Sequence, residues 1–363
     1  MNNSKIIAAI SKDRRYRQIA LPFEIGKTEQ QVKDAEFLIR KDGTIFNVEG
    51  WYHPAGYVVG EVLYAPDEKG DKYIFGQRYR KVTLYPGTYK PIPYPDRAKV
   101  LREIDPQFDQ TEINPFFAKY KQILPVTDFV AYLPSSRALK RALAQSNGHT
   151  KFYVDFVNLI NLLGLRIDEI SLGLTGAPLL GNTGRYHDLD VVFSGNLNKN
   201  LQIAKTMRDL AINEPWRRLF EGGKAWQIRF FNDLKTLICT FFTYSKHSDA
   251  PLRDFSMEIL EKGVVAQGGV SDDTHSMYTP TILQLKDVTI MKNHRLIQRY
   301  ANLPIIVYHT ASRGDCFNND IVQASGALVE IKQADKGIYP AICVIDREGL
   351  RNISPPWEGY YRE

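Results

Sequence analysis

The chain is poor in cysteine and has no long apolar run. Its three cysteines, Cys239, Cys316 and Cys343, have no metal-binding spacing. So sparse and odd a set argues against a disulfide scaffold and is typical of reduced thiols inside a cell. No stretch approaches the ~18 continuous apolar residues of a membrane-spanning helix, and no signal peptide is evident after Met1. We therefore expect a cytoplasmic protein with no membrane partner.

A complete P-loop is also missing, as are internal repeats and low-complexity segments. Gly26-Lys27-Thr28 resembles the end of a P-loop, but that motif needs a glycine where Leu21 stands. The 363 residues have an ordinary globular composition and are enough for two or three domains. A net charge of +6 is compatible with an anionic partner such as a nucleotide or a nucleic acid.

The most informative stretch spans residues 170–193 and predicts a strand, a glycine-rich turn and a second strand. Apolar residues alternate with small ones over 170–174, and an apolar run follows Asp190. Because side chains alternate along a strand, Asp188 and Asp190 share one face. Two adjacent carboxylates repel each other, and a hard divalent cation such as Mg²⁺ relieves that repulsion. The pair is thus a candidate metal site, although Asp-x-Asp alone is more often solvated surface.

The turn before the two carboxylates supplies a candidate phosphate site. Gly176 is able to adopt positive φ and lets a bulky anion approach the backbone. Backbone N–H groups of Gly176 and Ala177 in such a turn form an anion-binding concavity. A phosphate site next to a metal-binding pair indicates a nucleoside triphosphate bound with its metal ion.

This segment resembles the signature of the polymerase-β-type nucleotidyltransferase superfamily. Thr175-Gly176-Ala177, a ten-residue spacer over 178–187, and Asp188-Leu189-Asp190 match its pattern. The order of segments is similar to that of the predicted archaeal nucleotidyltransferases, with a β-rich region before the core and another after it. The resemblance implies Mg²⁺ at Asp188 and Asp190, phosphates at Gly176 and Ala177, and nucleotidyl transfer.

The sequence departs from that pattern at two places. The superfamily often has serine where this chain has Ala177, and it expects a third carboxylate on a later strand, here residues 234–244, which contain no acid. Asp233 stands just before that strand and is the candidate third acid, with a hairpin-turn role at Asn232-Asp233 as the alternative. Lys224 and Arg229 are candidate triphosphate ligands, with ordinary surface charge as the equal alternative.

The predicted fold class is an α/β nucleotidyltransferase-like core, a small mixed sheet with helices, flanked by two β-rich regions. The expected domains are a β-rich region over 1–96, a helical lead-in and core over 97–248, and a β-rich region over 249–363. The last of these resembles a small OB-like barrel, a fold that often binds single-stranded nucleic acid. Helices are expected over 152–163 and 197–213, and Ser135 or Ser136 is expected to cap another.

Basic and aromatic residues interleave in the N-terminal region, where a second hypothesis for function arises. Such a surface binds phosphates and stacks bases, and a sheet with one solvated basic face is the alternative. The stretch consists of Arg78, Tyr79, Arg80 and Lys81. Near the N-terminus Lys12, Arg14, Arg15 and Arg17 surround Tyr16; a solvated helix face is favoured there over phosphate contact.

Together these features predict an enzyme that transfers NMP from an NTP to a hydroxyl acceptor, RNA or DNA among the candidates. The alternative is a non-catalytic nucleic-acid-binding protein that retains a degenerate nucleotidyltransferase fold. A scaffold role in a larger complex is the third hypothesis.

Overall fold

The computed structural model describes residues 3–85, 87–88, 90–110, 121–166, 168, 170–182, 186–221, 224–346 and 348–355. The chain divides into two compact units. The first comprises residues 1–153 and 172–186, and the second comprises residues 154–171 and 187–363. This division cuts across the region 97–248 that the sequence predicted as one domain.

The first unit is built on one β-sheet with the strand order β1-β8-β2-β3-β4-β6-β5, while β7 pairs with β4. Buried apolar side chains of neighbouring strands, among them Leu38, Phe46 and Val62, form its core. The strands are β1 (Leu21–Pro22), β2 (Phe37–Arg40), β3 (Ile45–Val48), β4 (Tyr57–Pro66), β5 (Lys72–Ile74), β6 (Gln77–Lys81), β7 (Gln122–Pro125) and β8 (Phe129–Leu133).

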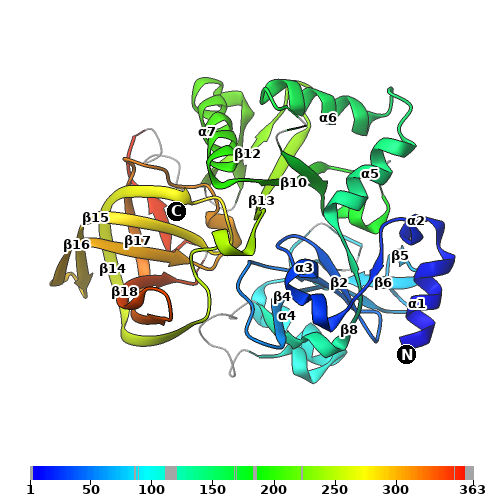
Figure 1. Cartoon of the computed structure of the whole chain (residues 1–363), viewed down its shortest axis with the longest axis horizontal. Helices are drawn as coiled ribbons and strands as arrows, with labels where there is room; N and C mark the ends of the chain where they lie inside the picture. Colours follow the sequence, from blue (N-terminus) through cyan, green and yellow to red (C-terminus); the bar gives the residue numbers. More distant parts are fainter. Residues whose placement is uncertain are drawn as a thin grey trace. The chain divides into compact units, whose positions relative to one another are not determined.

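Short helices and one turn complete the first unit (Figure 1). The helices are α1 (Asn3–Lys12), α2 (Arg14–Arg17), α3 (Thr28–Gln31), α4 (Tyr94–Ile104) and α5 (Ser135–Gln145). The expected serine cap of α5 is absent: its N-cap is Pro134, and Ser135 Oγ donates instead to the buried carboxyl of Glu36 at 3.0 Å. Strand β9 (Ser171–Leu174), whose residues from Leu172 onward belong to this unit, is a member of the five-stranded sheet β11-β12-β13-β10-β9 and leads into the short 3₁₀ helix η4 (Ala177–Leu180).

The second unit contains the strand that carries the two aspartates. Strand β10 (Asp188–Gly195) pairs in parallel with β13 (Leu237–Tyr244), which pairs antiparallel with β12 (Lys224–Phe231), and β11 (Arg218–Glu221) lies beyond it. Helix α7 (Leu197–Asn213) follows β10 and packs on this sheet, and α6 (Lys151–Leu162) lies largely in the same unit. Both helices lie where the sequence predicted them. Gly164, in a left-handed conformation, ends α6.

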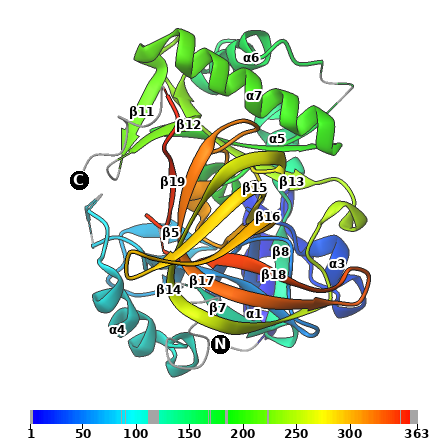
Figure 2. The same ribbon diagram turned by 90° about the vertical axis from the view of Figure 1, so that its left-hand side faces the viewer.

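A second sheet of this unit curls back on itself (Figure 2). Its order is β14-β15-β16-β18-β17-β19, and β14 pairs additionally with β17, so the curl places the two strands side by side. Val264, Leu285 and Ile305 belong to the apolar core inside the curl. The strands are β14 (Phe255–His275), β15 (Thr281–Lys292), β16 (Arg295–Val307), β17 (Ile321–Gln333), β18 (Gly337–Val344) and β19 (Leu350–Asn352).

The predicted fold class is wrong. The described chain is mostly β, with 43% strand against 26% helix, and it forms three sheets rather than an α/β nucleotidyltransferase-like core. The resemblance rests on about twenty residues, whereas an eight-stranded sheet formed by the chain before them and a six-stranded sheet formed by the chain after them contain most of the strands. Where an OB-like barrel was expected, the structure has the curled six-stranded sheet. No described helix has the length and apolar character needed to cross a membrane.

Candidate functional site

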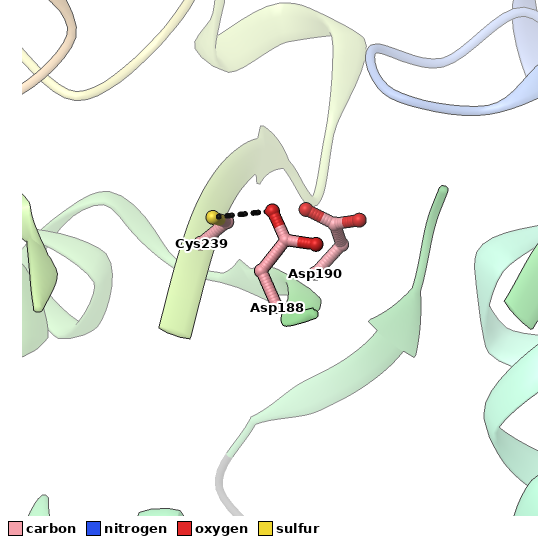
Figure 3. A group of neighbouring side chains, drawn as sticks. All are labelled: Asp188, Asp190 and Cys239. Carbon is pink, nitrogen blue, oxygen red and sulfur yellow. Dashed lines mark hydrogen bonds between the residues drawn. The ribbon is translucent and has the colours of Figure 1, made fainter. Parts of the chain in front are cut away.

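Strand β10 presents Asp188 and Asp190 on one face, as the alternation predicted. Leu189 and Val191, the residues between and after them, are fully buried, while the two aspartates are only partly covered. The buried side chains fix the strand against the core and leave the carboxylates on the opposite face. Figure 3 shows the two carboxylates next to each other.

The parallel partner strand brings Cys239 to this pair. Asp190 is in register with Cys239, and the Cys239 thiol donates a hydrogen bond to Asp188 Oδ2 at 3.3 Å. One donor atom from each of Asp188, Asp190 and Cys239 lies within 4.8 Å of the others. The carboxylate cluster thus has a thiol as its third member, on the strand where the resemblance implied a third carboxylate.

Arg229, on the neighbouring strand β12, lies next to Cys239. It is paired in register with Cys239; its Nε donates to Cys239 Sγ at 3.2 Å, and its Nη1 donates to Glu221 Oε2 at 2.6 Å. Burial raises the pKa of the Cys239 thiol, the Asp190 carboxylate raises it further, and Arg229 opposes the rise. The thiol is therefore neutral at physiological pH and acts as a hydrogen-bond donor.

The donor set fits a divalent cation. Carboxylate oxygens suit hard ions such as Mg²⁺, Mn²⁺ and Ca²⁺, and a cation between Asp188 and Asp190 offsets their mutual repulsion. A thiolate suits softer ions such as Zn²⁺, but the protonated Cys239 is a poor ligand for Mg²⁺. If Mg²⁺ binds here, the two carboxylates hold it, and water or a substrate oxygen supplies the remaining ligands.

Asp233, the predicted third acid, lies away from this cluster in the turn between β12 and β13. Its Oδ1 accepts a hydrogen bond from Arg217 Nη2 at 2.5 Å, and its Oδ2 accepts one from Asn158 Nδ2 at 3.1 Å. The bond from Arg217, followed by that from Asn158, lowers the pKa of this carboxyl. Its contacts are those of a turn residue, the role that the sequence left open as the alternative.

Lys224 and Arg229, the predicted phosphate ligands, differ in how they are placed. Lys224 is 5% exposed, and its Nζ donates to the buried Asp315 carboxylate and to the Ala311 carbonyl. It is therefore engaged inside the second unit. Arg229 lies beside the candidate metal site, and its partner Glu221 is about half exposed, so a phosphate oxygen is able to compete for this guanidinium.

The predicted phosphate turn belongs to the first unit. Gly176 has φ +65° and ψ −132°, a conformation open to glycine, and Ala177 begins η4. The hydroxyl of Thr175 donates to the Ala35 carbonyl at 2.5 Å. Spacer residues 183–185 lie outside the described residues. Since the unit boundary falls between Tyr186 and His187, the turn and the aspartate pair belong to different units.

The predicted nucleic-acid surface is interrupted by its aromatic residue. Tyr79 is fully buried, and its hydroxyl donates to the Gly43 carbonyl at 3.0 Å. Arg78 Nη1 donates to the Gly70 carbonyl at 3.1 Å, and Arg80 Nε lies 3.5 Å from an Asp67 oxygen. The Lys81 ammonium lies 5.9 Å from the centre of the Tyr64 ring. Tyr79 is thus unavailable for base stacking in this conformation.

Sequence reasoning missed Cys239 as a site residue. The cysteine was assessed only for spacing to other cysteines, whereas its neighbours in space are carboxylates 49 and 51 positions earlier. One usable signal was present: residues 234–244 were expected to form the strand that carries the third acid, and Cys239 lies near its middle.

Searches of the chain against protein-family models, curated proteins and solved structures found no match.

Proposed function

We propose that the protein binds a nucleoside triphosphate with Mg²⁺ at Asp188 and Asp190 and transfers its NMP to a hydroxyl acceptor. The observation that carries the proposal is the convergence of Asp188, Asp190 and Cys239, with Arg229 hydrogen-bonded to the thiol. In the reaction the acceptor oxygen attacks the α-phosphorus, the bond to pyrophosphate breaks, and the hydroxyl proton is released. RNA and DNA are candidate acceptors.

The residues of the second unit have separate roles in this proposal. Asp188 and Asp190 hold the metal ion, and Arg229 contacts a phosphate oxygen after release of the exposed Glu221. When bound, the metal ion orients the triphosphate and neutralises charge as pyrophosphate leaves. The Cys239 thiol keeps Asp188 in place through its hydrogen bond.

The lack of a carboxylate on β13 favours a second function, in which nucleotide is bound without transfer. The resemblance gives the third carboxylate the role of activating the attacking hydroxyl, and here Cys239 occupies the corresponding strand. In this alternative the protein is a non-catalytic binding protein, with nucleic acid as a candidate partner. The two proposals share the metal site and differ only in transfer.

Thermal melting with and without Mg²⁺ and NTP tests the shared site. Binding at a hundred times Kd stabilises the folded state by about 2.7 kcal/mol, so we expect the melting temperature to rise by several degrees. Asp188→Asn with Asp190→Asn should lose that rise and remain folded, because the exchange preserves size and removes repulsion. The control variant, Asp209→Asn with Asp287→Asn, removes the same charge at exposed positions. It should show the same rise in melting temperature as the wild type. A full rise in the first double variant would disprove the assignment.

Label transfer from α-labelled NTPs to RNA, DNA and the protein itself separates the two functions. Transfer that needs Mg²⁺ and both aspartates supports the enzyme. A metal-dependent melting shift without transfer supports the binding protein. In that case Cys239→Asp supplies the missing carboxylate and should bind the metal ion more tightly. Titration with Mn²⁺ measures the affinity, and Cys239→Ser is the control variant.

A further inference from the structure

Arg141, on α5 in the first unit, is a buried cation that makes no direct ion pair with a described residue, and Asp13 acts on it only at longer range. Its residue is 7% exposed, and its Nε and Nη1 have no hydrogen-bond partner within the described part of the chain. No carboxylate among those residues lies within ion-pair distance of it. Removing a charge from water without a partner costs several kcal/mol. A buried guanidinium in this state is unusual, because buried polar groups are nearly always hydrogen-bonded.

The guanidinium lies against the turn that follows η4. Gly181 has φ +76°, and a Cβ atom built there would lie 2.9 Å from Arg141 Nη1. The same Cβ would lie 3.0 Å from Arg15 Cβ. Glycine therefore provides both the backbone conformation and the room that the guanidinium occupies. Gly181 is half-buried and Asn182 is exposed, so the turn reaches the surface beside Arg141.

Nearby groups leave the surroundings of Arg141 with a net positive charge. Arg15 binds both oxygens of Asp13, at 3.1 and 2.7 Å, so that carboxylate is already neutralised. Tyr16 donates to the Leu180 carbonyl at 2.8 Å, and burial raises its pKa to about 12, so it is uncharged at neutral pH. Burial lowers the pKa of Arg141; Tyr16 and Asp13 oppose this decrease, and Arg15 adds to it. The exposed basic residues of α1 and α2 nearby in the sequence are Lys12, Arg14 and Arg17.

We propose that Arg141 binds the phosphate group of a small phosphorylated ligand against the Gly181 turn, with Arg15 as the second cation. A guanidinium presents paired N–H donors that match phosphate oxygens, and Arg15, although paired with Asp13, places a second guanidinium nearby. The site lies wholly within the first unit and does not depend on the metal site or on the proposed function. Asp188→Asn with Asp190→Asn should therefore retain it.

The test is thermal melting with inorganic phosphate, pyrophosphate or ATP, in EDTA and at constant ionic strength set with NaCl. We expect the wild type to melt at a higher temperature with at least one of these probes. Arg141→Met should lose that rise. Without phosphate, Arg141→Met should melt at or above the wild-type temperature, because it removes an unpaired buried charge. If the role of Arg141 were purely structural, Arg141→Met would instead melt at a lower temperature than the wild type.

Arg137→Met is the matched control, since it removes the same charge from an exposed position four residues earlier on α5. It should retain the full rise, including any general salting-out effect of phosphate. Gly181→Ala should weaken the rise, because its methyl group occupies the guanidinium space. Sulfate gives a smaller rise if the site is selective for phosphate.

Hydrogen exchange on the wild type keeps the proposal testable if the variants do not fold. Phosphate should slow exchange in peptides covering α5 and residues 177–182 and leave the second unit unchanged. An equal melting shift in Arg141→Met overturns the proposal. So does the absence of both a shift and protection in the wild type with all three probes.

Discussion

Lys224 and Arg141 are both buried cations, one in each unit, but among the described residues only Lys224 makes a direct ion pair with a carboxylate. Lys224 donates to Asp315 and to a carbonyl, whereas two guanidinium nitrogens of Arg141 have no described partner. A buried cation with an internal anion is part of the structure, and removing either member leaves the other unpaired. A buried cation without one is available to an external anion. Lys224, the phosphate ligand predicted from the sequence, is therefore occupied by an internal partner, whereas Arg141, inferred from the structure, is not.

The largest effect should come from breaking the internal pair. Lys224→Met leaves the Asp315 carboxylate buried and unpaired, and we expect a loss of about 3–5 kcal/mol in the free energy of unfolding. Arg141→Met should cost nothing or increase stability in the absence of phosphate. Denaturant unfolding of both variants measures the contrast. Adding Asp315→Asn to Lys224→Met should restore most of the loss; equal costs for Lys224→Met and Arg141→Met would refute the distinction.

Glu36 extends the comparison to a buried acid. Its partners are the N–H and hydroxyl of Ser135, both at 3.0 Å, and burial raises its pKa to about 7 from an ordinary 4.5. Between these two values the folded state binds more protons than the unfolded state, so stability falls as pH rises through that range. The loss is complete above pH 7 and amounts to about 3 kcal/mol at most.

Glu36→Gln should remove this pH dependence while preserving an oxygen acceptor for Ser135. The variant should be more stable than the wild type above pH 7 and comparable to it below pH 4.5. Denaturant unfolding from pH 4.5 to 8 is the measurement. Glu103→Gln, at an exposed position on α4, is the control and should differ from the wild type by the same amount at every pH. A pH-independent difference for Glu36→Gln would contradict the prediction.

The smallest effect should come from exposed cations. Arg80 meets Asp67 at a partly exposed site, where an ion pair contributes about 0–1 kcal/mol. Arg78→Ala with Arg80→Ala should thus change stability little. If the stretch contacts nucleic acid, the double variant should bind RNA or DNA more weakly, and the dependence of log K on log salt should flatten. Binding measured at several salt concentrations tests this prediction. An unchanged slope of log K against log salt would exclude phosphate contacts by these arginines.

Much of the local structure was predictable from the sequence. Helix α7 begins and ends where its apolar spacing placed it, and the alternation around Leu189 put Asp188 and Asp190 on one face. The turn role of Asp233 was among the stated alternatives. These features depend on residues a few positions apart, because backbone periodicity and turn geometry act over that range.

The sequence by itself determined the paired carboxylates, the glycine turn and the β-rich ends. Only the tertiary structure decided which side chains these elements meet. The register of β10 with β13 brings Cys239 to the aspartates, and the packing of the second unit buries Lys224 against Asp315. The turn at Gly181 lies against Arg141, forty residues earlier. Such contacts arise from long-range pairing of strands and from burial, which no local pattern of residues specifies.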